Sequence, residues 1–385
     1  MPLHNSHIEF DRGNLSTSPI KGYHYVVRPN FFIAFSFYFQ MTPMEFKVLV
    51  TGGLGYIGSH TVVELANAGF TPVIVDNLYN SQLEVLKRLA NIIGFEPVLY
   101  IIDLCDATAV KLLSEKESDI KGIIHFAACK AVGESAAKPL LYYRNNLISL
   151  LNLLEAYKSH SISFIFSSSC TVYGQPDQLP VTELAPLKLA ESVYGRTKQM
   201  CEQILEDITV SNENFRVLSL RYFNPVGAHH TSLIGELPLS PHLNLVPIIT
   251  QTAINRRPMF TVFGDDYNTK DGTNVRDYVH VVDIANAHVC ALRKASSEQQ
   301  TLRYDVYNLG TGRGYSVFEI IKTFENVSGV KINYKIGPRR VGDVSEIWAD
   351  VSKAEKELKW KAQLDLESML ISAWNWEKNM NEKAL

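Results

Sequence analysis

The stretch from Ser192 to Lys198, SVYGRTK, places a tyrosine and a lysine four residues apart. On a helix such a pair lies one turn apart on the same face, so the ammonium of Lys198 can approach the phenol of Tyr194. A phenol with its ordinary pKa of about 10 is a poor base at neutral pH. Nearby positive charge favours the phenolate, lowers that pKa and makes the tyrosine usable as acid and base. Because a chain with 18 tyrosines contains about one such pair by chance, other motifs must decide whether this pair is catalytic.

A run of serines ends the predicted strand SFIFSSS, residues 163–169. In doubly wound folds, ligands bind at the carboxyl ends of the parallel strands, which is where Ser169 falls. Its hydroxyl can pass a proton between a substrate and the phenol of Tyr194.

The first predicted strand runs directly into TGGLGYIGSH, which contains glycines at 52, 53, 55 and 58. Such a glycine loop allows a tight turn, a close approach of the backbone to a pyrophosphate, and packing of the following helix on the strand. The amides at the start of that helix are free to bind phosphate. Asp76 stands at the end of the second strand, where an acid accepts the ribose hydroxyls and repels a 2'-phosphate. The motif therefore predicts a dinucleotide site for NAD rather than NADP.

The elements that must position these residues begin at Phe46, where short apolar runs alternate with stretches of helical period. Near-continuous apolar runs indicate strands that are buried on both faces, so we expect an α/β fold with a doubly wound parallel sheet. The helix that carries Tyr194 is expected to use Val193, Met200, Ile204 and Leu205 as its apolar positions. The predicted strands cover residues 47–50, 72–76, 97–103, 122–128, 163–169 and 216–224.

The rhythm of strands and helices changes after Pro225, where loops rich in Pro, Gly and Asn begin. We expect an NAD-binding domain over residues 45–225 and a smaller, mixed α/β ligand-binding domain over residues 226–385. Part of the second region is expected to return to the first. Residues 1–44 are interpreted as an extension outside the fold, upstream of a true start at Met41 or Met44.

The apolar run Phe31 to Phe39 in this extension is too short for a membrane-spanning helix, which takes about 20 residues. The sequence after it offers no small-residue cleavage site of a secretory signal. No membrane partner is therefore expected.

The composition excludes other classes of function. A net charge of -3 over 385 residues, with the signs interspersed, gives no footprint for nucleic acid. The five cysteines are scattered and never in C-x-x-C spacing, so we expect neither disulfides nor a zinc site, and a reducing cytoplasm fits best. His229 and His230 are interpreted as part of a polar loop, and no metal is expected.

Taken together, TGGLGYIG, the serine run, YGRTK and RYFNPVGA resemble the extended short-chain dehydrogenase/reductases. The stretches KAVGES, DGTNVRDYVHV and YNLGTG resemble the UDP-glucose 4-epimerases within that family, over about residues 46 to 376. The resemblance implies an isomerase of galactose metabolism that interconverts UDP-galactose and UDP-glucose, holds NAD and forms a homodimer.

The resemblance also assigns roles to residues. It implies that Ser169, Tyr194 and Lys198 are catalytic. For NAD it points, besides these three, to Gly52, Gly55, Tyr56, Ile57, Gly58, Asp76, Asn77, Leu78, Tyr79, Asn80, Ser81, Asp103, Leu104, Phe126, Ala127, Ala128, Cys129, Lys130, Asn145 and Phe223. For the UDP-sugar it points to Lys130, Ser169, Tyr194, Asn224, Asn244, Leu245, Arg276, Arg340, Asp343 and Ile347. Two arginines with bidentate guanidinium groups suit a diphosphate in a chain without overall positive charge.

The implied mechanism is a transient oxidation at the sugar C4. Tyr194 takes the proton of the 4-hydroxyl, directly or through Ser169, while the hydride passes to NAD. The 4-keto sugar turns over while UDP stays anchored, and the hydride returns to the opposite face, so NAD is regenerated in each cycle.

The sequence departs from the family pattern at a few positions. Ala128 and Cys129 replace a glycine and an apolar residue beside the cofactor, and Cys170 replaces an alanine. We expect NAD binding to be retained, because a buried cysteine behaves as a small apolar side chain. Ile347 stands where relatives that reject N-acetylated sugars carry a bulkier aromatic residue, which raises the hypothesis of activity on UDP-GlcNAc and UDP-GalNAc.

Three alternatives remain. A nucleotide-sugar 4,6-dehydratase needs an extra acid and base, commonly an Asp-Glu pair after the active-site hydroxyl, where this chain has Cys170 and Thr171. An epimerase for UDP-glucuronate or a UDP-pentose differs only in a pocket shape that the sequence does not reveal. A non-catalytic NAD-binding scaffold has no need of the intact set of Ser169, Tyr194 and Lys198.

Overall fold

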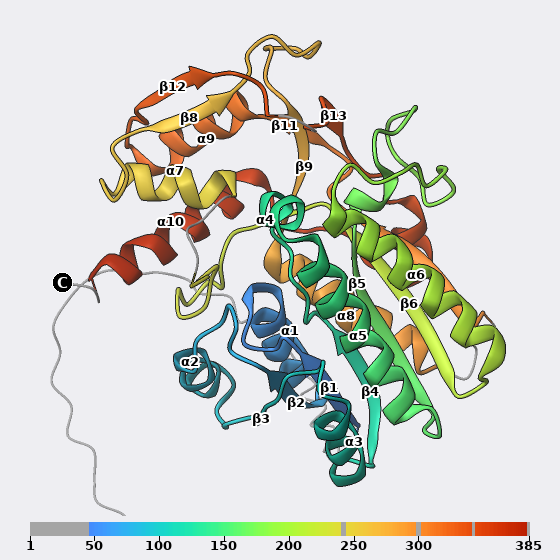
Figure 1. Cartoon of the computed structure of the whole chain (residues 1–385). Helices are drawn as coiled ribbons and strands as arrows, with labels where there is room; N and C mark the ends of the chain where they lie inside the picture. The colour runs from blue at the N-terminus through green and yellow to red at the C-terminus, as the bar shows by residue number, and fades with distance from the viewer. Residues whose placement is uncertain (1–45, 240–243, 298–301, 341–342, 383–385) are drawn as a thin grey trace, which may run out of the picture. The chain divides into compact units, whose positions relative to one another are not determined.

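The computed structural model describes residues 46–239, 244–297, 302–340 and 343–382. The predicted extension, residues 1–44, lies outside the described residues. Strands and helices alternate from Lys47 onward, and parallel strands form a seven-stranded sheet in the order β10-β6-β5-β4-β1-β2-β3 (Figure 1). The predicted doubly wound sheet is confirmed. Its strands are β1 (Lys47–Thr51), β2 (Thr71–Asp76), β3 (Val98–Ile101), β4 (Ile120–His125), β5 (Ile162–Ser169), β6 (Phe215–Tyr222) and β10 (Tyr304–Leu309).

Helices cover both faces of this sheet. One apolar cluster joins the sheet to α1 (Tyr56–Asn67), α2 (Glu84–Ile93) and α8 (Val281–Ala295). A second cluster joins the other face to α3 (Ala107–Lys116), α5 (Pro139–Tyr157) and α6 (Val193–Ser211). Each large apolar side chain that is fully buried in these layers contributes about 1.5–3 kcal/mol. The central strands are therefore held rigidly between two layers of helices.

The chain reverses its direction of winding between β1 and β4. It proceeds from β1 outward to β2 and β3, and then crosses back to place β4 on the other side of β1. The connections that follow β1 and β4 consequently leave the sheet in opposite directions. In open α/β sheets, ligands bind in the crevice at this switch point, beyond the carboxyl ends of the strands.

The expected burial of every strand is wrong for the third apolar run. β3 has a single neighbour and lies at the edge of the sheet, where Val98 is 50% and Ile101 57% exposed. The opposite edge is formed by β10, which comes from the C-terminal part of the chain and pairs with β6 in register from Tyr304 with Val217 to Leu309 with Tyr222. The last strand of the sheet therefore comes from the region after Pro225, where the regular alternation of strands and helices ends.

The C-terminal part forms a smaller layer of mixed structure. β7 (Asn224–Val226), β9 (Val275–His280), β11 (Gly314–Ser316) and β13 (Glu346–Ile347) make one sheet, and β8 (Phe260–Phe263) pairs with β12 (Tyr334–Gly337). A third apolar cluster packs these strands against α7 (Leu245–Ala253), α9 (Val317–Ser328) and α10 (Leu366–Glu382), which gather at one end of the molecule in Figure 1. α9 begins with a capping box, in which Ser316 and Glu319 satisfy each other's backbone amides.

Short elements complete the description. α4 (Val132–Ala137) follows β4, a 3₁₀ turn (Cys170–Tyr173) follows β5, and a π-helical turn (Ala354–Leu358) packs on α8. In the described part of the chain, no helix is both long enough and apolar enough to cross a membrane.

Candidate active site

A cavity of about 1200 Å³ lies at the carboxyl ends of the central strands. Its walls come from the loops that follow β1, β2, β3 and β4, from the end of β5, the start of α6 and the end of β6, and from the C-terminal part of the chain. Of the residues that the sequence assigned to catalysis, to NAD or to the UDP-sugar, all except Leu78 and Leu245 line this cavity. Leu78 instead packs against the cluster around α1 and α2, and Leu245 packs at the start of α7.

The glycine loop is a tight turn whose geometry excludes side chains. Gly52 has a φ of +68°, and a Cβ on Gly58 would lie 2.2 Å from the carbonyl oxygen of Gly52. α1 begins after Gly55, which has no side chain to cap the helix, and its first turn contains no acidic residue. The first amides of α1 are therefore available to an anion, and the field at a helix N-terminus favours negative charge.

Asp76 lies beside this loop at the end of β2. Its carboxylate accepts hydrogen bonds from the amides of Leu54 (3.1 Å) and Leu78 (3.0 Å) and from the hydroxyl of Ser81 (2.7 Å). A carboxylate offers about four acceptor positions, so one remains for a ribose hydroxyl. Asp76 thus shapes the cavity as well as lining it.

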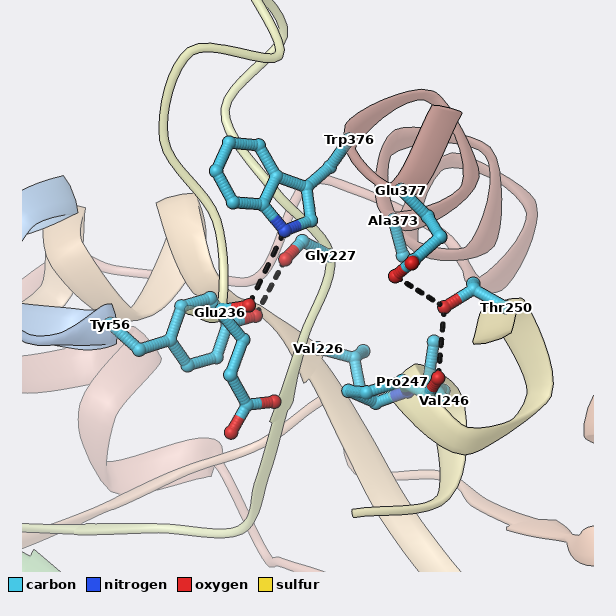
Figure 2. Close-up of a pocket in the computed structure, with 10 residues that line it drawn as sticks. All are labelled: Tyr56, Val226, Gly227, Glu236, Val246, Pro247, Thr250, Ala373, Trp376 and Glu377. Atoms are coloured by element: carbon cyan, nitrogen blue, oxygen red, sulfur yellow. Dashed lines mark hydrogen bonds between the residues drawn. The ribbon is translucent and has the colours of Figure 1, made fainter. Parts of the chain in front are cut away.

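The side chain of Tyr56 reaches across to the segment after β7. Its hydroxyl donates to the carbonyl of Gly227 over 2.6 Å, which ties the start of α1 to the segment after β7 (Figure 2). Burial raises the pKa of Tyr56 well above its ordinary value, and the charge of Glu236 adds to this. Any contact of Tyr56 with a phosphate therefore falls to its backbone amide.

Ser169, Tyr194 and Lys198 come together as predicted from β5 and α6. α6 begins at Val193 because Ser192 caps it, accepting a hydrogen bond from the amide of Gly195. This cap places Tyr194 in the first turn and Lys198 one turn later, with the ammonium 5.9 Å from the centroid of the Tyr194 ring. Both side chains are buried, at 9% and 3% exposed. Ser169 caps the 3₁₀ turn through the amide of Thr171.

The electrostatic environment of Tyr194 differs from the expectation that nearby positive charge lowers its pKa. The pKa of Tyr194 is raised, chiefly by burial and further by the neighbouring Tyr222, while the hydroxyl of Ser169 acts in the opposite direction. Burial lowers the pKa of Lys198 to about 8. An oxidised nicotinamide adds further positive charge beside the phenol, so the expected fall in the pKa of Tyr194 stays a prediction for the cofactor-loaded protein.

The segment that carries Tyr194 is a helix, α6, as predicted, and three of its four expected apolar positions pack in apolar clusters. Leu205 is buried, but Met200 is 39% exposed, and Val193 and Ile204 are only partly buried. The buried face also carries Tyr194, Lys198 and Glu202, so the reactive side chains themselves face the sheet. Polar groups with partners are thus buried beside the aliphatic ones, which an apolar pattern alone does not predict.

A buried ion pair holds α6 on the sheet behind these residues. Arg221 of β6 forms two hydrogen bonds with Glu202, of 2.9 and 2.6 Å, and both side chains are almost fully buried. The hydroxyl of Ser168 donates to the same carboxylate, and Arg221 also contacts the hydroxyl of Tyr173. The backbone next to Ser169 is thereby locked to the helix that carries Tyr194.

The residues predicted to bind the UDP-sugar come from several loops of the C-terminal part. Arg276 of β9 contacts the carboxylate of Asp343 (3.4 Å), and the guanidinium of Arg340 lies 4.0 Å above the ring of Phe263. Ile347 pairs with Arg276 across β13 and β9, and it packs in one cluster with Phe223. Asn224 lies at the start of β7.

Cys129 and Cys170, which depart from the family pattern, both line the cavity. Burial raises the pKa of Cys129 to about 11 and that of Cys170 to about 12, so both remain thiols at neutral pH. Asn146 holds the backbone of Cys129 through its amide and its carbonyl. These facts agree with the role expected of small apolar side chains.

Sequence reasoning missed other side chains that line the cavity: Glu134, Thr171, Glu191, Tyr222 and Glu236. Glu134 and Tyr222 lie in KAVGES and RYFN, two stretches that resemble the family. These stretches were the sequence signal from which both residues could have been assigned to the site. No sequence pattern pointed to Glu236, because its position in the cavity depends on contacts with residues that are distant in the chain.

His229 is more buried than a polar loop suggests, whereas His230 is exposed. His229 is buried, and its ring is tilted against that of His230, with ring centroids 4.2 Å apart. Burial lowers the pKa of His229 to about 4. Within the described ranges, no group of three or more His, Cys, Asp or Glu side chains is placed to hold a metal ion.

Comparisons with known proteins agree with this site. A family model described as GDP-mannose 4,6 dehydratase matches residues 49–372. The chain is 49% identical to the UDP-glucose 4-epimerase of Dictyostelium discoideum over 338 residues, which is 88% of this chain and 97% of that protein.

Solved structures give the same result. One is a UDP-glucose-4-epimerase from Stenotrophomonas maltophila with bound NAD and formylated UDP-arabinopyranose, with a TM-score of 0.84 and 45% identity over 88% of this chain and 99% of that one. Another is a UDP-glucose 4-epimerase from Bifidobacterium longum in complex with NAD+ and UDP, with a TM-score of 0.82 and 46% identity over 86% and 98%. The chain therefore belongs to the UDP-glucose 4-epimerase family of extended short-chain dehydrogenase/reductases.

Proposed function

We propose that this protein is an NAD-dependent UDP-sugar 4-epimerase that interconverts UDP-galactose and UDP-glucose. One observation carries the proposal: Ser169, Tyr194 and Lys198 line the same cavity as the glycine loop and the arginines Arg276 and Arg340. An acid-base group, a dinucleotide loop and diphosphate-binding cations in one cavity are the parts that this isomerisation needs.

The residues present fit NAD. A side chain at Gly52 or Gly58 would clash with neighbouring backbone, so these glycines keep the turn tight, and the uncapped start of α1 supplies amides to a pyrophosphate. Asp76, Phe223 and Lys198 all line the cavity, which supports a role for Asp76 in binding the ribose hydroxyls of the adenosine half and for Phe223 and Lys198 in binding the nicotinamide half. When bound, NAD supplies a reversible acceptor for the hydride of the sugar C4.

The diphosphate of the substrate is bound by Arg276 and Arg340. Arg276 is held on β9 by Asp343, which orients its guanidinium while leaving donors free. A planar guanidinium pairs with phosphate through two hydrogen bonds. Firm anchoring of UDP lets the sugar turn over between the two halves of the reaction.

Tyr194 and Ser169 carry out the proton transfer. Tyr194 removes the proton from the sugar O4 and later returns it, and Ser169 relays that proton where the phenol is out of direct reach. Lys198 places a positive charge beside the phenol, which stabilises the phenolate. The burial of all three side chains excludes water and strengthens these interactions.

A simple assay tests the proposal. Purified protein is mixed with UDP-galactose without added nucleotide, and the product is analysed for UDP-glucose. We expect conversion, because NAD is regenerated in every cycle and stays bound. No conversion by a protein that contains NAD contradicts the proposal.

A 4,6-dehydratase is the rival within the same fold, and the matching family model carries that name. Cys170 and Thr171 follow Ser169, and both line the cavity where the extra acid and base of a dehydratase are required. The raised pKa of Cys170 makes it a poor substitute for an acid. We therefore favour epimerisation.

N-acetylated sugars are a second candidate substrate class. Ile347 lines the cavity beside Phe223 and is smaller than an aromatic residue. The space left by this side chain supports a proposal that UDP-GlcNAc and UDP-GalNAc are accepted in addition.

We also propose that the protein is a homodimer. α5 and α6 pack side by side (Figure 1), and both carry exposed apolar side chains, with Leu140 78%, Leu151 47% and Met200 39% exposed. Exposed apolar side chains on two adjacent helices support an interface between subunits. Light scattering tests this, and we expect Leu151→Glu to shift a dimer toward a monomer, whereas Leu239→Glu, at an exposed leucine on neither helix, leaves it dimeric.

A role in cytoplasmic galactose metabolism completes the proposal. The five cysteines are all free thiols, which suits a reducing compartment. Fractionation of cells that produce the protein tests this location.

A further inference from the structure

The segment Gly235–Leu239, named the cavity strap here, lines the ligand cavity along its whole length. At one end, the amide of Leu239 donates to the side chain of Asn80, a residue of the predicted NAD site (3.1 Å). At the other end, Glu236 lies beside the ring of Tyr56, near the start of α1 (Figure 2). The strap therefore spans from the glycine loop to the loop that follows β2.

A single oxygen of Glu236 connects the two predicted ligand sites. Its Oε1 accepts hydrogen bonds from the ammonium of Lys130 (3.3 Å) and from the side-chain amide of Asn244 (2.8 Å). Lys130 belongs to the FAACK stretch beside the cofactor, and Asn244 is assigned to the UDP-sugar. Hydrogen bonds to a charged oxygen are about twice as strong as neutral ones, so both partners depend on this carboxylate.

The far side of the strap is fixed by the C-terminal helix. The ring of Trp376 packs on Gly235, where a Cβ would lie 2.6 Å from it, and the indole Nε1 donates to the carbonyl of Glu236 (3.3 Å; Figure 2). Arg88 of α2 reaches the carbonyl of Leu233 (3.4 Å) and lies over the same indole. The backbone of the strap is thus anchored, while the side chain of Glu236 reaches Lys130 and Asn244.

We infer that Glu236 is a positioning residue that couples the retention of NAD to the occupancy of the UDP-sugar site. This inference rests on the proposed function. When UDP holds Asn244 in place, Glu236 remains on Lys130 and the strap stays across the cavity, so NAD leaves more slowly. Because coupling between two sites is reciprocal, NAD also increases the affinity for UDP.

The test measures the release of NAD rather than turnover. Holoenzyme is loaded with radiolabelled NAD and diluted into excess unlabelled NAD, with or without saturating UDP, and the bound label is followed by filtration. In the wild-type protein we expect UDP to slow the release. In Glu236→Gln, which keeps an acceptor for Asn244 but loses the charge that holds Lys130, we expect release about tenfold faster, and the effect of UDP falls to about twofold or less.

Matched variants separate this role from general effects. Glu191→Gln removes the same charge from the same cavity and should release NAD at the wild-type rate. Trp376→Phe keeps a ring on Gly235 but loses the hydrogen bond to Glu236, and should also accelerate release. If Glu236→Gln fails to fold, Trp376→Phe alone decides the matter.

Two results overturn the inference: release rates within about twofold of wild type in both variants, or an unchanged effect of UDP. Failure of the proposed function has a different signature, since the purified wild-type protein would then contain no NAD after denaturation and extraction.

Discussion

Lys198 donates a hydrogen bond from its ammonium to the backbone carbonyl of Ser167 over 2.6 Å. The same ammonium lies 4.6 Å above the ring of Phe166 and within 6 Å of the Tyr194 ring, at 5.9 Å from its centroid. A buried charge needs such partners, because water no longer solvates it. The end of β5 therefore fixes the position of the cation beside the phenol, two residues before Ser169.

The lowered pKa of Lys198 predicts an alkaline limb in the activity profile. The ammonium is present below its pKa of about 8 and is lost above it, and only the charged form stabilises the phenolate of Tyr194. We expect kcat for UDP-galactose to fall as the pH rises through about 8. Because the pKa of Lys198 is lower in the folded protein than its ordinary value of 10.5, folding favours the neutral amine. The neutral amine therefore stabilises the folded protein fully above pH 10.5, and this stabilisation is lost as the pH falls through about 8.

Lys198→Arg provides the check on this assignment. A guanidinium keeps its charge above pH 12, so the variant should be slower but should lose the limb near pH 8. If kcat of this variant still falls with a midpoint near pH 8, another group is titrating.

Replacing Tyr194 by Phe should separate chemistry from binding. The variant keeps the ring that packs with Cys129 and Tyr142 but loses the acid-base hydroxyl. We expect bound NAD at the wild-type ratio and kcat lower by about 10³-fold.

Tyr142→Phe is the matched control. It removes another buried hydroxyl from the same cluster, one that donates to the carbonyl of Ala131. It should cost about 1–2 kcal/mol of unfolding free energy in urea and change kcat only a few-fold. Equal activity of Tyr194→Phe and wild type would falsify the role assigned to the phenol.

Gly58→Ala should abolish the retention of NAD. The new Cβ would lie 2.2 Å from the carbonyl oxygen of Gly52, so the loop must move by an amount that spoils its amide geometry. We expect little NAD in the purified variant, measured by absorbance after denaturation, and a loss of stability of about 1–3 kcal/mol.

Gly133→Ala is the control for this substitution. Gly133 also lines the cavity, but an added Cβ meets no atom within 4 Å. It should retain NAD, and a parallel loss of NAD in both variants argues against the steric explanation.

Ile347→Tyr should narrow the substrate range. The larger side chain would project from β13 into the cavity beside Phe223, in the space that we propose for an N-acetyl group. We expect kcat/KM for UDP-GalNAc to fall about 100-fold while that for UDP-galactose falls less than about tenfold. Ile347→Val keeps the space open and serves as the control. Wild-type protein that converts UDP-galactose but not UDP-GalNAc refutes the extended specificity.

The sequence by itself determined the type of fold and the main chemical groups. Alternating apolar runs and helical periods are local patterns, so they predicted six strands of the central sheet and the doubly wound class. The glycine loop and the pair of Tyr194 and Lys198 are equally local, since a turn of chain is enough to bring their members together. The resemblance of several motifs to one family then indicated the reaction.

Only the tertiary structure decided features that depend on residues far apart in the chain. The pairing of β10 with β6 joins residues about ninety positions apart, and no periodicity records it. The edge position of β3 and the buried polar face of α6 follow from the neighbours that each element acquires. The contacts of Glu236 with Lys130 and Asn244 arise in the same way, because they require three segments that meet only in the folded protein.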